Sequence, residues 1–160
     1  MTDKRQQDGW LARRDDLRAR ACQHDVNAMA FLSIVMDAVE IWDDLIDKDK
    51  PVANADTNRV FINLLFWLPQ NKFFDLNKAY LLPIIMTCIN AWMDSDALKE
   101  TKEERNLLAA WWLKQMGVEL YGAVAFLTGG FEHMRAISME SRSVLAHEDF
   151  SDYLQEIDHA

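Results

Sequence analysis

The sequence has few of the residues that cross-link or interrupt a chain. Its 160 residues include five glycines, three prolines and two cysteines. Cys22 and Cys88 form no Cys-x-x-Cys motif, so we expect two small buried thiols and no structural disulfide. The alternating pattern typical of strands is also missing, and turn residues are too rare for a protein built from hairpins. These absences argue against a β-sheet fold and a disulfide-stabilised fold.

Long apolar runs and a basic excess are also missing. The most apolar stretches, residues 60–68 and 80–93, are too short or too interrupted to span a bilayer, so we predict no membrane insertion. The first seven residues are polar, and we expect no secretory signal. With 26 acidic residues against 17 basic ones, the formal charge is -9. This balance argues against direct nucleic-acid binding.

The composition favours one helical domain. Half of the residues are hydrophobic, including six Trp and eight Phe, so the chain can bury a sizeable core. Its length is that of about one domain, and apolar residues recur three and four positions apart. We therefore predict an all-α fold, a single compact bundle of about five to six helices over residues 1–160.

The same periodicity predicts where the helices lie. A first polar helix continues or bends near His24 into an acidic helix that ends near Lys48. Pro69 should end one helix, Pro83 should break or kink another, and Gly129 with Gly130 should stop a third. The expected helical ranges are 8–20, the acidic helix to about residue 48, 57–68, 73–98, 102–128, 131–145 and 150–157.

Two helix starts carry candidate capping residues. Asp56 or Thr57 can cap the helix over 57–68, and Thr101 with Glu104 fits a capping box. The helix over 57–68 is so apolar that we expect most of its surface to be buried.

The most specific chemical feature is a stripe of five carboxylates within eleven residues of one helix. Successive helical residues advance by about 100°, so these side chains share an arc of about 120°. No Lys or Arg is interleaved among them, whereas a purely structural face more often alternates in sign. The stripe either meets water or collects divalent cations. Its members are Asp37, Glu40, Asp43, Asp44 and Asp47.

Three of these residues form a DDxxD motif, WDDLID. The motif resembles the first aspartate-rich motif of trans-isoprenyl diphosphate synthases and of squalene and phytoene synthases. The resemblance implies that Asp43, Asp44 and Asp47, with Glu40 in support, bind Mg²⁺ ions that clamp a diphosphate. Those enzymes are about twice as long and carry a second acidic motif. The stripe is also similar in a general way to the helical carboxylates that surround Mg²⁺ in MazG-like all-α pyrophosphatases. This chain lacks the facing ExxE and ExxD spacing of those enzymes.

Two further acids could face the stripe. Asp94, in NAWMDSD, is the nearest counterpart of a second motif. Glu119 is the only charged residue between Lys114 and Glu132. It is either a metal ligand or acid/base group opposite the stripe, or a core carboxylate that a Tyr, a Trp or Gln115 satisfies.

A second resemblance covers more of the chain. The segments IWDDLIDKDKPV, FWLPQNKFF, LLPIIMTCINAW and AFLTGG look like a group of small phage and prophage proteins of unassigned function. This resemblance implies a compact helical protein in the cytoplasm of an infected host cell or in a virion. We therefore expect an acidic phage protein that acts through a protein partner or self-association, as a virion component, assembly factor or host-directed factor. The alternative is a Mg²⁺-dependent enzyme acting on a diphosphate; no residue is assigned a catalytic role, and no cofactor other than Mg²⁺ is expected.

Overall fold

A computed structural model describes residues 4–48, 50–145 and 149–159. The predicted all-α bundle is confirmed, and the described residues form no strand. Short 3-10 or π segments lie between some of the helices. The elements are α1 (Lys4–Ala21), α2 (Val26–Asp47), α3 (Asn54–Ile62), η1 (Asn63–Trp67), η2 (Leu68–Gln70), α4 (Lys72–Lys99), α5 (Glu104–Lys114), η3 (Met116–Val118), α6 (Glu119–Val144) and α7 (Phe150–His159).

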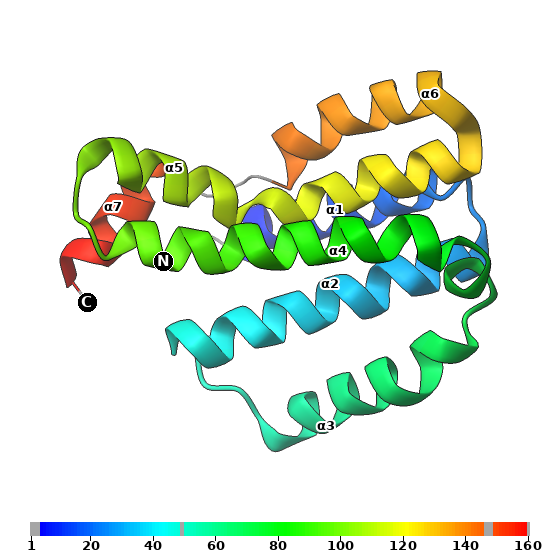
Figure 1. The fold of residues 1–160 in the computed structure, drawn as a ribbon, viewed down its shortest axis with the longest axis horizontal. Coiled ribbons are helices and arrows are strands. Elements are labelled where there is room, and N and C mark those ends of the chain that lie inside the picture. Colours follow the sequence, from blue (N-terminus) through cyan, green and yellow to red (C-terminus); the bar gives the residue numbers. More distant parts are fainter. Residues whose placement is uncertain (1–3, 49, 146–148, 160) are drawn as a thin grey trace.

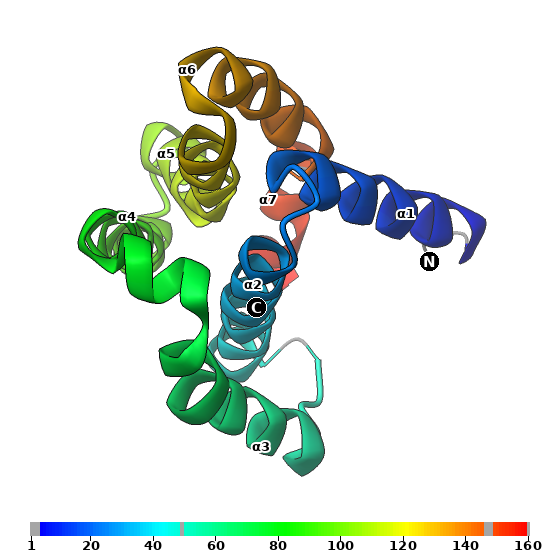
Figure 2. The same cartoon turned by 90° about the vertical axis from the view of Figure 1, so that its right-hand side faces the viewer.

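The helices pack around a core that four of them share. In Figure 1, α2 lies between α3 and α4, and α3 lies at the lower edge of the molecule. Figure 2, turned by 90°, again shows α3 at the edge, while α1 and α6 lie on the opposite side of α2. Helix α1 packs along α6, and α3 packs against α2. The largest fully buried side chains are Leu17, Phe31, Leu32, Leu81, Leu120, Tyr121 and Val124.

The acidic helix has well-defined ends. Gln23 and His24 have positive φ angles and separate α1 from α2. The carboxylate of Asp25 accepts hydrogen bonds from the backbone N–H groups of Asn27 and Ala28, both at 2.8 Å, and so caps α2. The helix ends where Lys48 adopts a left-handed conformation, which confirms the predicted end near that residue.

Helix α3 differs most from expectation. It begins at Asn54 after Ala53, and no side chain caps it, so the predicted cap at Asp56 or Thr57 is wrong. The helix widens into the π segment η1, and η2 follows with Pro69 near its start. Among residues 54–67, all of which the structure describes, Val60 alone is buried. The prediction that most of this surface is buried is therefore also wrong.

Helix α4 runs without a break through Pro83. Asn71 caps it by accepting a hydrogen bond from the backbone N–H of Phe74 at 2.9 Å. The expected break at Pro83 is absent because the helix is long and packs against α2, α5 and α6, whose contacts outweigh the loss of one backbone hydrogen bond.

The predicted long helix over 102–128 is two helices. Helix α5 ends at Lys114, and the 3-10 turn Met116–Val118 leads into α6. No side chain caps α5, so the expected capping box of Thr101 and Glu104 does not form. The Thr101 hydroxyl instead accepts a hydrogen bond from the side-chain amide of Asn106 at 3.0 Å.

Helix α6 folds back on itself at Gly130. The φ of 76° and ψ of -169° at this residue break the helix into two arms, which confirms the predicted stop at Gly129 and Gly130. The two arms approach closely, since a Cβ atom added at Gly122 would lie 2.6 Å from Ser138 Oγ.

Candidate functional site

Each carboxylate of the acidic stripe meets a cation from outside α2. Arg59 of α3 donates to Asp37, and Arg14 of α1 donates to Glu40 at 2.9 Å. Lys50, beyond the helix end, lies 3.4 Å from Asp44. The stripe therefore ties α2 to its neighbours.

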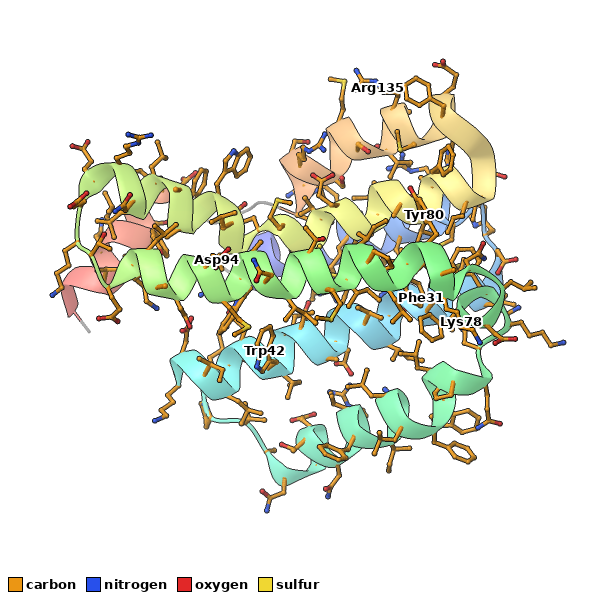
Figure 3. The ribbon with its side chains drawn as sticks, in the orientation of Figure 1. Phe31, Trp42, Lys78, Tyr80, Asp94 and Arg135 are labelled. Atoms are coloured by element: carbon orange, nitrogen blue, oxygen red, sulfur yellow. The ribbon has the colours of Figure 1, made fainter. Side chains whose placement is uncertain are left out.

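The strongest cluster surrounds Lys114, the last residue of α5. Its Nζ lies 2.5 Å from Asp47 Oδ2 and 3.4 Å from Asp43 Oδ1. Lys99 of α4 adds a second cation 3.5 Å from Asp47 Oδ1. The indole N–H of Trp92 donates to Asp43 at 2.8 Å, and the Trp92 and Trp42 rings lie 4.2 Å apart between α4 and α2. Figure 3 shows Trp42 in this position.

Burial raises the pKa values of three carboxylates in the stripe, and the neighbouring cations lower them. Burial raises the pKa of Glu40 above its ordinary value, and the charge of Arg14 offsets this only in part. Burial also raises the pKa of Asp43 despite Lys114 and Trp92. Burial acts in the same direction on Asp47, but the hydrogen bonds and charges of Lys114 and Lys99 outweigh it and leave the pKa of Asp47 lowered.

The two predicted facing acids lie elsewhere. The guanidinium of Arg142 holds Glu119 through contacts of 2.7 and 2.8 Å, so its partner is neither a stripe residue nor a Tyr, a Trp or Gln115. Asp94 is exposed on α4 and accepts a hydrogen bond from Asn90 at 2.8 Å (Figure 3). Within the described ranges, no three His, Cys, Asp or Glu side chains are placed to hold a metal ion.

A cavity of about 480 Å³ opens beside the first half of the stripe. Asp37 and Glu40 line it, whereas Asp43, Asp44 and Asp47 do not. Sequence reasoning did not select the lining residues from other elements. The available sequence signal for these lining residues was the spacing of Arg14 and Arg18, which lie four residues apart on one helix. The charged and polar lining residues are Arg14, Arg18, Ser33, Asp37, Glu40, Arg59, Asn63, Lys114, Gln115 and Tyr121.

No family model, curated protein or solved structure matches this chain.

The second unusual surface is a run of apolar residues at the end of α3 and in η1. Six of the seven residues from 61 to 67 are large hydrophobics with exposed fractions between 36% and 71%. We call this run the apolar segment; its members are Phe61, Ile62, Leu64, Leu65, Phe66 and Trp67. None of the described helices combines the length and hydropathy that a membrane crossing requires.

Proposed function

We propose that this protein acts through protein association, and that the apolar segment is the contact surface. The observation that carries the proposal is the exposure of six large hydrophobic side chains in seven consecutive residues. Isolated exposed hydrophobics are ordinary, but a contiguous run exposes apolar area to water at a cost that a bound partner removes.

The area of the segment suits the centre of an interface. A fully buried aromatic side chain covers about 150–250 Å², and Phe61, Phe66 and Trp67 are each more than half exposed. Together with the three aliphatic residues, the segment presents roughly 500 Å² of apolar surface. A standard interface buries about 800 Å² on each partner. Flanking polar residues of α3 and α4 would complete it.

The charges around the segment favour a second copy of this chain as the occupant. Residues 60–71 contain no charged side chain, although the chain carries a net charge of -9. Arg59, which is paired with Asp56 and Asp37, lies directly before this uncharged stretch, and Lys72 lies after it. In a two-fold pairing, two uncharged surfaces would meet without opposing like charges at the contact itself. The contact would then be apolar and uncharged in both copies.

The ion pairs support a structural role for the acidic stripe. A diphosphate enzyme would need Asp43, Asp44 and Asp47 to release Lys114, Lys99 and Lys50 before they could bind Mg²⁺. Association needs no such rearrangement, which is why we favour it over the enzymatic alternative. The phage origin and the location in a host cytoplasm or virion stay predictions from the resemblance.

The experiment compares oligomeric states by sedimentation velocity. We expect the wild type to form dimers at micromolar concentration and Leu65→Ser/Phe66→Ser to be monomeric. The matched control is Phe131→Ser/Met139→Ser, which removes two equally exposed hydrophobics from α6 (58% and 68%) and should remain dimeric. Circular dichroism should show the same helix content in all three proteins.

Two outcomes would contradict the proposal. A monomeric wild type would overturn self-association, and equal loss of dimer in the control would overturn the assignment to the apolar segment.

A calorimetric titration of Mg²⁺ with inorganic diphosphate addresses the stripe separately. Saturable binding that Asp43→Asn/Asp47→Asn abolishes would support the enzymatic alternative instead.

A further inference from the structure

We infer that the cavity between α1, α2 and the start of α6 binds a small amphipathic carboxylate, a molecule with one anionic head and an apolar body. None of the six residues of the apolar segment lines the cavity, although Asn63 of η1 does, and this inference does not rest on the proposed association. Its volume of about 480 Å³ falls within the roughly 300–1,000 Å³ of small-molecule pockets.

Two arginines supply donors at one side of the cavity. Arg14 and Arg18 lie one turn apart on α1, and each uses a single guanidinium nitrogen in a hydrogen bond, to Glu40 at 2.9 Å and to Asp15 at 2.7 Å. Among the described residues, the buried Nε atom of each arginine has no hydrogen-bond partner. A guanidinium has five N–H donors in a fork that matches a carboxylate. Both side chains therefore retain donors that an anion can take up.

Tyr121 adds a third donor from α6. The residue is 1% exposed and lines the cavity, yet its hydroxyl has no hydrogen bond to any part of the chain that the structure describes. Burial raises the pKa of Tyr121 to about 12, and the charges of Arg18, Arg14 and Glu40 also act on it. The hydroxyl is thus a neutral donor close to the two arginines. The hydroxyl is not among the buried polar atoms that lack a partner, so it is not closed off, and a ligand carboxylate in the cavity can accept its hydrogen bond.

The remaining wall suits an apolar body. Ile34, Met36 and Val39 of α2 line the cavity together with Val118, Leu145 and Trp10. The Trp10 ring lies 5.0 Å from the guanidinium carbon of Arg14. One ligand can therefore place its head on the arginines and its chain against aliphatic side chains.

The charge balance favours a single negative charge on the ligand. The cations that line the cavity are Arg14, Arg18, Arg59 and Lys114, and they are paired with Glu40, Asp15, Asp37 and Asp47 respectively. Asp37 and Glu40 would repel a doubly charged phosphate ligand more strongly than a singly charged carboxylate ligand. The geometry of a planar fork also matches a planar carboxylate.

The test is isothermal titration calorimetry with octanoate, octyl phosphate and octanol as probes. We expect octanoate to bind at least tenfold more tightly than octanol, because the alcohol lacks the charge, and more tightly than octyl phosphate. Tyr121→Phe and Arg18→Gln should each weaken octanoate binding about tenfold. The matched controls, Tyr80→Phe on α4 and Arg135→Gln on α6, should leave binding unchanged; Figure 3 labels both residues.

A second set of variants distinguishes octanoate binding in the cavity from binding at other apolar surfaces. Val39→Trp should fill the cavity and abolish octanoate binding, whereas Leu65→Ser/Phe66→Ser should leave it intact. Circular dichroism and thermal melting must show that each variant is folded. Absence of octanoate binding, equal binding of octanol, equal or tighter binding of octyl phosphate, or loss of binding in the apolar-segment variant would each overturn the assignment.

Discussion

At the scale of single residues, the acidic stripe shows how two similar carboxylates come to differ. Asp43 and Asp47 are one turn apart and both contact Lys114. Asp47 has the shorter contact and a second cation in Lys99, so its pKa falls, whereas burial dominates at Asp43 and its pKa rises. Lys114, Lys99 and burial together thus leave the two acids with opposite shifts in pKa.

Asp47→Asn and Asp43→Asn should therefore respond oppositely to pH. In the unfolded chain both pKa values are about 3.9. The lowered folded-state pKa of Asp47 contributes stability that is present above that value and lost as the pH falls through the folded pKa. The raised folded-state pKa of Asp43 contributes stability that is complete below about 3.9 and lost as the pH rises through its folded pKa.

The free energy of unfolding, measured by urea denaturation between about pH 3 and pH 7, checks this. Relative to wild type, Asp47→Asn should lose stability as the pH rises, and Asp43→Asn should gain stability. Parallel pH profiles for the two variants would show that Lys114 does not distinguish them.

At the scale of elements, the turn at Gly130 determines where the second arm of α6 lies. Its φ of 76° and ψ of -169° belong to a region that is essentially restricted to glycine. Gly130→Ala should therefore lower the free energy of unfolding by about 1–3 kcal/mol, measured by urea denaturation.

Gly9→Ala is the matched control for this substitution. Gly9 lies inside α1, where an added Cβ would meet nothing within 4 Å. The change should stabilise the protein by about 0.5–1 kcal/mol because alanine favours the helix. Equal effects at both positions would mean that the backbone at Gly130 is not strained for other residues.

Local chemistry explains which elements were predictable. The end of α2 near Lys48 and the turn at Gly130 depend on residues next to each other in the chain, so sequence patterns indicate them. The predicted long helix over 102–128 was wrong because apolar periodicity continues through η3, where Gly117 is the one helix-breaking residue and no proline accompanies it. Periodicity detects helices better than it detects short irregular joints between them.

The candidate site was harder to predict because its contacts are distant in the chain. The cations that hold Asp37, Glu40 and Asp47 lie between 22 and 67 positions away. For a stripe without interleaved bases, the sequence left open solvation or divalent-cation binding, while the structure provides arginines and lysines from other elements. Exposure of the apolar segment was missed for a related reason, since a hydrophobic pattern predicts that a surface is covered but does not identify what covers it.

At the scale of the whole molecule, charge and apolar surface act in opposite directions. Two copies of a chain with net charge -9 repel each other, while in the dimer that we propose the apolar segment of α3 and η1, with α3 at the edge of the bundle (Figure 2), would bring them together. Any dimer therefore depends on how far the solvent screens the repulsion.

Raising the salt concentration should strengthen the dimer. Between about 0.05 and 0.5 M NaCl, screening shortens the range of repulsion from more than 10 Å to less than 5 Å, and the apolar contact is not weakened. We expect the dimer dissociation constant, from sedimentation equilibrium, to fall about three- to tenfold over this range. A constant that rises with salt would indicate an interface dominated by ion pairs between the two copies.

The indole pair between α2 and α4 gives the molecule an optical reporter. Two rings 4.2 Å apart, one of them hydrogen-bonded to Asp43, form an asymmetric chromophore. Its near-ultraviolet circular dichroism and its emission depend on the spacing of two helices and on the charge of one carboxylate. Docking of α2 on α4 and the protonation of Asp43 can thus be followed in solution without adding a label.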